Sequence, residues 1–194
     1  QIMTGEAGEA RTAAFLTALA LKGETGSEIE SFARSMRRNA VSWPGESPDV
    51  LCDTCGTGGD GAATINISTL AALSLAGLEL PVAKHGNRAV SSTTGSADLL
   101  EELGVRLDRD HKEVSELLQK VGITFLFAPT WHPAMKHAAP VRKALGFRTA
   151  FNLLGPLTNP APVTHQVIGV FDRSFMGVMA QALALLGRRG AYVV

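Results

Sequence analysis

Residues 53–98 contain four turn-forming segments rich in glycine, hydroxyl or amide groups, and short apolar runs lie between them. The first is the glycine run C-G-T-G-G-D-G at 55–61. Such turns leave backbone N–H groups free to face a ligand and keep bulky side chains away from it. A helix that begins beside such a turn adds the positive end of its dipole. The stretch therefore predicts a pocket for a heavily phosphorylated small molecule.

The glycine run also contains G-x-G-x-x-G, formed by Gly56, Gly58 and Gly61. That pattern is typical of dinucleotide-binding oxidoreductases when the glycines open a helix directly. Here residues 62–68 precede the next predicted helix, at 69–76, and no G-K-[ST] follows as a P-loop requires. The inserted amide and hydroxyl groups favour phosphate and magnesium over a nicotinamide dinucleotide. The oxidoreductase remains an alternative that rests on the glycines alone.

Composition narrows the class of protein further. The chain has 194 residues, 45% of them hydrophobic and 19% charged, which is typical of a globular protein. Its formal net charge is zero, which disfavours a protein that gathers nucleic acid or anionic membrane. Cys52 and Cys55 have no second pair with which to complete a zinc site. Such low cysteine use predicts a cytoplasmic protein, and no apolar run is long enough to span a membrane.

The first 40 residues have the pattern of helices. Thr25 and Glu28 form a capping box, and Ile29, Phe32, Ala33 and Met36 follow on one face of the predicted helix. Pro and Gly at 44, 45 and 48 mark a linker. We therefore expect a small helical domain at 1–46, against which residues 129–146 pack. The apolar stripes of these helices also make a homodimer plausible.

The remaining residues, 47–194, alternate between short apolar runs and helical patterns. Strands are expected at 50–53, 80–83, 123–128, 166–171 and 191–194. Helices are expected at 69–76, 97–103, after Asp110 and at 174–186, with Ser96 as the cap of the second of these. Alternation of this kind predicts an α/β domain with a mostly parallel sheet flanked by helices, and a ligand site at the carboxyl ends of its strands.

Several motifs, in this order and at this spacing, resemble the anthranilate phosphoribosyltransferase family. They are C-G-T-G-G-D-G at 55–61, T-x-N-I-S-T at 64–69, K-H-G-N-R at 84–88, S-S-x-x-G-S-A-D at 91–98, H-P-A-M-K at 132–136 and P-V-R at 140–142. The resemblance extends over nearly the whole chain. It implies transfer of the phosphoribosyl group of phosphoribosyl pyrophosphate (PRPP) to the amine of anthranilate, with release of pyrophosphate, in tryptophan biosynthesis. Magnesium is the implied cofactor.

The resemblance also implies that the chain lacks the family's first helix and its C-terminal part. The α/β domain would then be incomplete at its C-terminus and without the acidic pair that binds magnesium. No partner other than the two small substrates is implied, neither nucleic acid nor membrane.

The resemblance assigns site residues by position. Ser68 is the implied magnesium ligand, and Gly56, Asn87, His132 and Arg142 are the implied contacts to anthranilate. No residue is assigned as acid or base, because an aromatic amine is already neutral near pH 7. The implied PRPP contacts are Gly56, Gly59, Asp60, Thr64, Asn66, Ile67, Ser68, Thr69, Lys84, His85, Gly86, Asn87, Arg88, Ala89, Val90, Ser91, Ser92 and Ser96.

Two relatives of the same fold remain as alternatives. A pyrimidine nucleoside phosphorylase also uses a Lys-His pair, but has it as K-H-S around the glycine run, whereas here it lies later, in K-H-G-N-R. A non-catalytic nucleic-acid-binding relative would need a basic groove, which the zero net charge disfavours.

Overall fold

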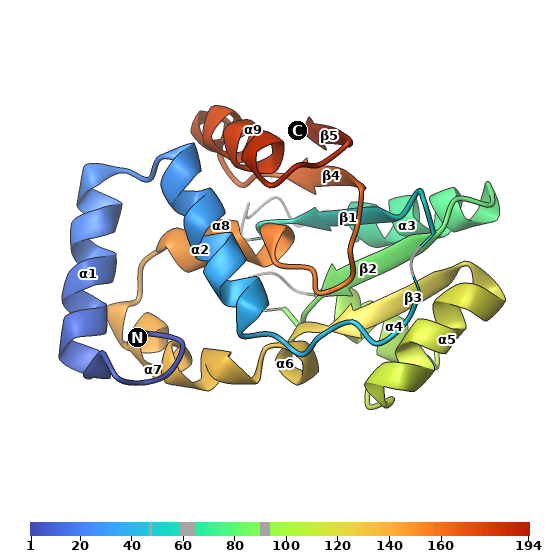
Figure 1. Cartoon of the computed structure of the whole chain (residues 1–194), viewed down its shortest axis with the longest axis horizontal. Helices are drawn as coiled ribbons and strands as arrows, with labels where there is room; N and C mark the ends of the chain where they lie inside the picture. The colour runs from blue at the N-terminus through green and yellow to red at the C-terminus, as the bar shows by residue number, and fades with distance from the viewer. Residues whose placement is uncertain (47, 59–64, 90–93) are drawn as a thin grey trace.

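The computed structural model describes residues 1–46, 48–58, 65–89 and 94–194. Within them the chain forms a five-stranded, fully parallel sheet in the order β3-β2-β1-β4-β5 (Figure 1). The strands are β1 (Cys52–Gly56), β2 (Val82–Gly86), β3 (Ile123–Phe127), β4 (His165–Gly169) and β5 (Gly190–Val193). Together with the helical N-terminal region, this sheet confirms the predicted α/β class.

Helices surround the sheet and build the N-terminal region. They are α1 (Gly8–Lys22), α2 (Gly26–Arg38), α3 (Ile67–Gly77), α4 (Ser96–Glu102), α5 (His111–Val121), α6 (Ala128–Trp131), α7 (Ala139–Leu145), α8 (Ala150–Leu154) and α9 (Met176–Leu185). Short 3-10 turns are η1 (Pro133–His137), η2 (Gly155–Leu157) and η3 (Arg173–Phe175). Across these described segments, no helix combines the length and apolar character that a membrane span needs.

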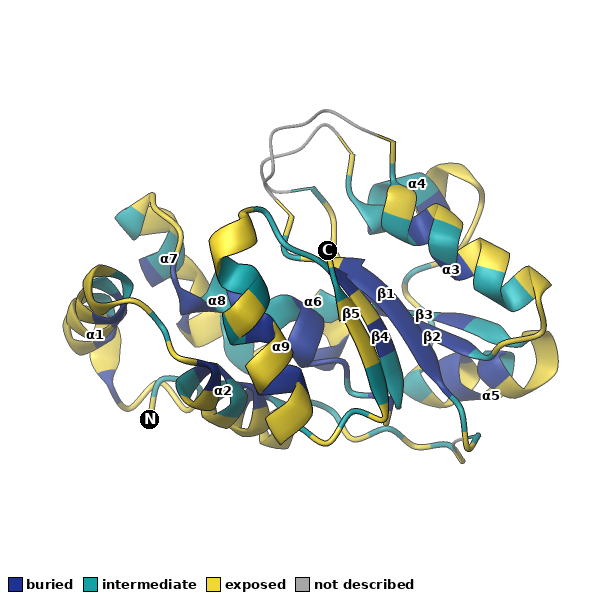
Figure 2. Ribbon diagram, turned by 90° about the horizontal axis from the view of Figure 1, so that it is seen from above, coloured by how far each residue is buried: buried dark blue, intermediate teal, exposed yellow. Residues whose placement is uncertain are grey.

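The two faces of the sheet are covered by different helices. On one face α3 packs through Ala72 onto Cys52 and Val82. On the other face α5 covers Ala83 and Leu126 in β2 and β3, and α8 and α9 cover Cys55 and Ile168 in β1 and β4. Figure 2 shows α3 on the opposite side of the strands from α8 and α9. Both faces of the central strand β1 are thereby buried, as parallel sheets require.

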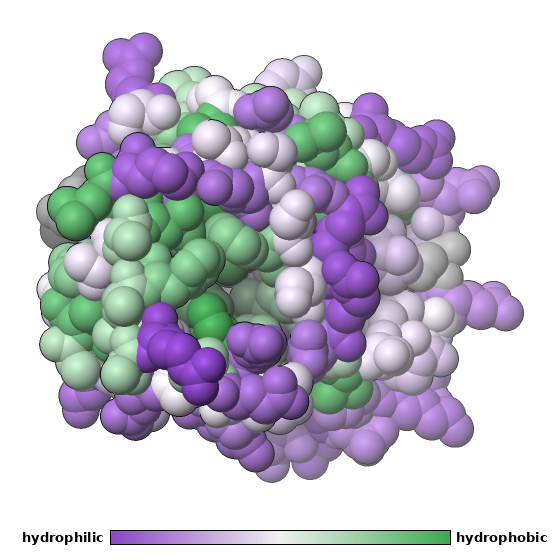
Figure 3. Space-filling model, turned by 60° about the vertical axis from the view of Figure 1, so that its left-hand side comes forward, coloured by the Kyte–Doolittle hydropathy of each residue, from purple (hydrophilic) through white to green (hydrophobic). Residues whose placement is uncertain are grey.

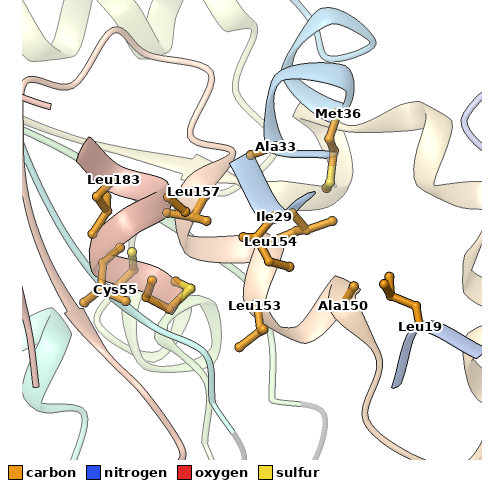
Figure 4. Packing of buried hydrophobic residues seen from close by; sticks show 13 residues of the cluster. Leu19, Ile29, Ala33, Met36, Cys55, Ala150, Leu153, Leu154, Leu157 and Leu183 are labelled. Carbon is orange, nitrogen blue, oxygen red and sulfur yellow. The ribbon is translucent and has the colours of Figure 1, made fainter. Parts of the chain in front are cut away.

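A cluster of buried apolar side chains joins the N-terminal helices to the sheet. We call it the apolar cluster (Figure 4). Its members are Leu19, Ile29, Ala33, Met36, Cys55, Ala150, Leu153, Leu154, Leu157, Ile168, Met179, Ala182 and Leu183. Helix α2 lies on α9 and α8, and α1 contacts α7 at the end of the molecule away from α3 and α5 (Figure 1). The domain boundary at residue 46 stays a prediction.

Local signals place the helix ends. The Thr25 hydroxyl accepts a hydrogen bond from Glu28 N at 3.3 Å, and the Glu28 carboxylate accepts one from Thr25 N at 3.0 Å, which confirms the capping box. Asp110 caps α5, and Gly122 ends it with φ of 78°. The prediction for α4 was wrong, because Gly95 is the cap and Ser96 is already helical. The Asp98 carboxylate reaches back and accepts a hydrogen bond from Gly95 N at 2.8 Å.

The predicted bounds of β1 and β2 were also wrong, by two residues at the start and three at the end of each strand. Each strand begins and ends later than expected, so Cys55, Gly56, Lys84, His85 and Gly86 lie inside strands. The cause is pairing with strands remote in sequence: β1 follows β4 as far as Gly56↔Gly169, and β2 follows β3 as far as Gly86↔Phe127. Helix α3 begins at Ile67 rather than at residue 69, with Asn66 as its cap.

Candidate functional site

The loops that follow β1 and β2 meet at the carboxyl edge of the sheet. The Asn66 amide, which precedes α3, donates to the backbone carbonyls of Thr94 at 3.2 Å and Gly95 at 3.3 Å. Gly95 packs so closely on the loop after β2 that an added Cβ would collide with the backbone nitrogen of Ala89. The starts of α3 and α4 are therefore fixed next to each other (Figure 2). The N-terminal ends of both helices, where the helix dipole is positive, therefore lie at this edge.

The glycine run starts in a turn that is bonded to β4. Thr57 N donates to Gly169 O at 2.9 Å, and the Thr57 hydroxyl accepts from Phe171 N at 2.9 Å. Gly58 has φ of 68°, in the left-handed region where glycine carries no Cβ penalty. This turn anchors one wall of the site on the central strands.

Lys84 links β2 to the first turn of α3. Its side chain is 2% exposed, and its ammonium donates to the carbonyl of Thr54 and, at 3.2 Å, to the hydroxyl of Ser68. The Thr54 hydroxyl donates to Ser68 O at 2.6 Å. Burial lowers the pKa of Lys84, and the nearby Asp53 carboxylate opposes that shift. Ser68 is thus held from both its backbone and its side chain.

Asp53 is 1% exposed. Its side chain lies on the face of the sheet opposite to Lys84 and α3, among hydrogen-bond donors. Its carboxylate accepts from His85 N at 3.2 Å, from the Asn159 amide at 3.0 Å and from the Gln166 amide at 3.3 Å. Arg188 Nε donates to the Gln166 side-chain oxygen at 2.6 Å. Burial raises the pKa of Asp53, and the charge of Lys84, the Asn159 amide and the His85 N–H oppose the rise.

Sequence reasoning did not single out Asp53, Asn159, Gln166 or Arg188 as site residues. A signal was present for two of them, because Asp53 and Gln166 are polar side chains inside strands that a parallel sheet buries, β1 and β4. The sequence does not show which remote side chains these two residues bond to. The hydrogen-bond network around Asp53 therefore becomes visible only in the folded structure.

Two buried histidines lie beside this network. The rings of His85 and His132 pack edge to face with centroids 5.1 Å apart. His85 Nδ1 lies 3.2 Å from Gly155 O. Burial lowers the pKa of His85 to about 3, with a smaller contribution from His132, and burial lowers the pKa of His132 to about 4. Both rings are therefore neutral at pH 7 and present a polar but uncharged surface.

Two predicted arginines lie in different surroundings. The Arg88 guanidinium pairs with Glu101 and, at 3.3 Å, with Asp98, so acidic side chains already compensate its charge. Arg142 lies on α7, half-buried, with its guanidinium 5.4 Å from the ring centroid of Phe151. Burial lowers the pKa of Arg142. A guanidinium nevertheless stays cationic at pH 7, because its ordinary pKa is very high.

The other predicted residues fall into two groups. Gly56 and Gly86 end their strands, Ile67 and Thr69 lie in the first turn of α3, and the Ser96 hydroxyl donates to Asn87 O at 3.4 Å. An added Cβ on Gly86 would collide with the Ser96 hydroxyl oxygen, so these segments pack tightly beside Asn87 and Ala89. The predicted contacts outside the described residues are Gly59, Asp60, Thr64, Val90, Ser91 and Ser92.

Ser68, the predicted magnesium ligand, offers a single hydroxyl oxygen. The described residues contain no group of three His, Cys, Asp or Glu side chains able to hold a metal ion. In proteins Mg²⁺ usually keeps several waters and binds through one or two protein oxygens together with substrate phosphates. The Ser68 hydroxyl, fixed by Lys84 at the start of α3, can supply one such oxygen.

Comparison with known proteins gives consistent matches. The family described as "Glycosyl transferase family, a/b domain" matches residues 48–194, and its helical bundle domain matches residues 1–40. The anthranilate phosphoribosyltransferase of Moorella thermoacetica is 57% identical over 193 residues, which cover 100% of this chain and 57% of that protein. The chain thus spans little more than half the length of the curated relatives that it matches.

Solved structures of anthranilate phosphoribosyltransferases are also similar to this chain. The crystal structure of anthranilate phosphoribosyltransferase from Thermus thermophilus has a TM-score of 0.92 at 52% identity, covering 96% of this chain and 56% of that one. The Saccharomyces cerevisiae enzyme in complex with PRPP and Mg has a TM-score of 0.88 at 33% identity, covering 95% of this chain and 52% of that one. The resemblance seen in the motifs is confirmed.

Proposed function

The chain belongs to the glycosyl transferase family defined by this α/β domain, and we propose that it is the PRPP-binding part of an anthranilate phosphoribosyltransferase. The observation that carries the proposal is the junction of Asn66, Ser68, Lys84 and Gly95 at one edge of the sheet. Those residues belong to separate motifs of the family, and the fold ties them together by direct hydrogen bonds.

The proposed reaction transfers the phosphoribosyl group from pyrophosphate to the amine of anthranilate. The bond from ribose carbon 1 to pyrophosphate breaks as the amine nitrogen attacks that carbon, and the nitrogen then loses a proton. The residues near Ser68 would position PRPP, since oriented substrates need little chemistry from the protein. Bound at Ser68, magnesium would neutralise charge on the leaving pyrophosphate. Lys84 would contribute a fixed positive charge below the phosphates.

Anthranilate would lie between the sheet edge and the helical region, against Gly56, Asn87, His132 and Arg142. A guanidinium can hold the carboxylate through two parallel hydrogen bonds, which makes Arg142 the sharpest of these assignments. The neutral rings of His85 and His132 suit an aromatic substrate, because they present no competing charge to its amine.

A homodimer through the N-terminal helices is part of the proposal. Helix α1 leaves Phe15 44% exposed and Leu21 84% exposed. Figure 3, which brings the α1 side of the molecule forward, shows apolar surface gathered around a hollow on this face. Both cysteines are free thiols, which fits a cytoplasmic location.

The proposal is tested first by calorimetric titration of this chain with PRPP and Mg²⁺. We expect binding, and Ser68→Ala should weaken it, since the variant removes the implied magnesium ligand. Ser74→Ala is the matched control, because Ser74 lies on the same helix and bonds only to Leu70 O within the described contacts. Absence of PRPP binding by the folded chain would contradict the proposal. Phosphorolysis of thymidine, or a gel shift at physiological salt, would instead favour one of the two alternatives.

The anthranilate assignment has its own test in the loss of anthranilate fluorescence during turnover. Arg142→Ala should raise the KM for anthranilate more than the KM for PRPP, whereas Lys143→Ala, an exposed neighbour on α7, should change neither. A larger increase in the KM for PRPP than in the KM for anthranilate would contradict the assignment of Arg142. If the chain binds PRPP but does not turn over, the same comparison is made by anthranilate titration of the PRPP-bound chain.

A further inference from the structure

Strands β1 and β2 pair much less than their neighbours do. The ladder between β1 and β4 runs over five residue pairs, and so does the ladder between β2 and β3. In these strands, whose residues are all described, β1 and β2 are in register only at Cys52↔Val82. Beyond that pair the two strands remain neighbours without continuing the ladder. We call this stretch, in which β1 and β2 share no ladder bonds, the opening. It leads to the turn after Gly56 and the loop after Gly86.

Three side chains occupy the opening and bond the backbone groups along it. The Asp53 carboxylate accepts from His85 N at 3.2 Å. The Lys84 ammonium donates to Thr54 O, and the Asn159 amide donates to Ala83 O at 2.7 Å. We call Asp53, Lys84 and Asn159 the polar wedge. Buried backbone groups must be paired, so without these side chains the opening would have to close or admit water.

The wedge is also internally connected. The Asn159 amide bonds to Asp53 as well as to Ala83 O, and its side-chain oxygen accepts from Ala161 N at 2.9 Å. Lys84 reaches from the opening to the Ser68 hydroxyl on the other face of the sheet. A change in any member should therefore move the strand ends that carry the two loops.

We propose that the polar wedge is a positioning device that sets the separation of the glycine turn after β1 and the Lys84–Asn87 segment. Asp53 and Asn159 are positioning residues: they act through the His85 and Ala83 backbone and need not touch substrate. The proposal rests on the proposed function, because the two segments are those expected to enclose PRPP. It gives a role to Asp53 and Asn159, to which the sequence analysis assigned none, and it explains why the ladder between β1 and β2 stops after one pair.

The decisive variant is Asp53→Asn, which keeps the shape of the side chain but puts an N–H₂ group among donors. Its amide oxygen can bond His85 N or face Asn159, but it cannot satisfy both as the carboxylate does. Asn159→Ala is a second variant, which removes the bond to Ala83 O and leaves Asp53 charged. Ser115→Ala is the matched control, because its buried hydroxyl bonds within α5, to Lys112 O, away from the wedge.

The first measurement is made without ligand, by following the His85 amide in a proton–nitrogen NMR spectrum. In the wild type a bond to a carboxylate should shift this proton downfield and protect it from exchange. In Asp53→Asn we expect the signal to move upfield and to exchange about tenfold faster, because a charge-assisted bond is lost. Ser115→Ala should leave both quantities unchanged. An unchanged His85 amide in Asp53→Asn would overturn the proposal.

The second measurement is the PRPP–Mg²⁺ titration of the same proteins. Both wedge variants should bind about tenfold more weakly than the wild type, the scale expected when one buried charged contact is lost, with Ser115→Ala unchanged. If the His85 amide responds while PRPP affinity stays the same in both wedge variants, the positioning role is refuted. If the wild type binds no PRPP, the proposed function fails, and the positioning role fails with it. The NMR result then separately decides whether the wedge holds the strands apart.

Discussion

The polar wedge and the apolar cluster hold neighbouring parts of the same sheet by different forces. In the apolar cluster, Ile29, Ala33 and Leu157 are fully buried and pack without directional bonds (Figure 4). In the wedge, Asp53 and Asn159 each satisfy several donors or acceptors at fixed angles. Packing contributes free energy in proportion to buried area, whereas hydrogen-bonded polar groups contribute little net stability but define geometry closely. We infer that the cluster stabilises the chain and the wedge positions its loops.

The largest effect on stability should come from the apolar cluster. Ile29→Ala removes a fully buried side chain of α2, and we expect it to lower the free energy of unfolding by about 3 kcal/mol. The quantity is measured by urea denaturation. Leu78→Ala is the control, because Leu78 is 73% exposed and should change stability little.

The same variant tests the division between the two regions. PRPP affinity of folded Ile29→Ala should equal that of the wild type, since the cavity lies between α2 and the helices packed on the sheet rather than at the strand ends. A loss of affinity comparable to that of Asp53→Asn would show that the two regions are not separable.

The histidines beside the wedge should make stability depend on pH, in contrast to the apolar cluster. The pKa of His132 is about 4 in the folded chain, below its ordinary value of 6.5, so the unfolded chain binds the extra proton first. Its contribution to stability is complete above pH 6.5 and is lost as the pH falls toward 4. Between pH 7 and pH 5 the loss should be about 2 kcal/mol for this residue.

His132→Gln isolates this contribution, because glutamine stays neutral over the whole range. Urea denaturation at pH 7 and pH 5 should show a smaller loss of stability for His132→Gln than for the wild type. Ile29→Ala should lose as much as the wild type does. Equal losses in all three proteins would mean that His132 titrates normally in the folded chain.

The two regions also differ in how far the sequence alone predicts them. The stripe Ile29, Phe32, Ala33 and Met36 was predicted from helical spacing. Ile29, Ala33 and Met36 are buried in the apolar cluster, and Phe32 is partly buried and packs against it. Spacing suffices there because one short helix carries the whole pattern. The parallel sheet and the junction of the motifs at its carboxyl edge were predictable for a related reason, since alternating strands and helices allow few topologies.

The wedge could not be predicted in this way. Asp53 bonds to Asn159 across 106 positions and to Gln166 across 113 positions of the sequence. Period-two alternation tells which face a strand residue occupies, but not which remote side chain will meet it there. The predicted ends of β1 and β2 were wrong for the same reason, because the sequence does not show which strands pair. Lys84 was therefore expected after its strand, although it lies inside it.

The smallest effect should come from the exposed capping box at the start of α2. Thr25→Ala removes the hydroxyl that accepts from Glu28 N, and we expect a loss of about 1 kcal/mol in unfolding free energy with no change in PRPP affinity. Ser31→Ala, an exposed serine on the same helix, is the control.

The Lys22 side chain, and then the Thr25 backbone and hydroxyl, lower the pKa of Glu28 to about 2. That carboxylate therefore supports the helix above its ordinary pKa of 4.5, and its support is lost as the pH falls toward 2. In Thr25→Ala the pKa of Glu28, measured by NMR titration, should rise part of the way toward 4.5, because the Lys22 bond remains. If the pKa of Glu28 stayed near 2, the Lys22 side chain and the backbone N–H of residue 25 would account for the shift without the Thr25 hydroxyl.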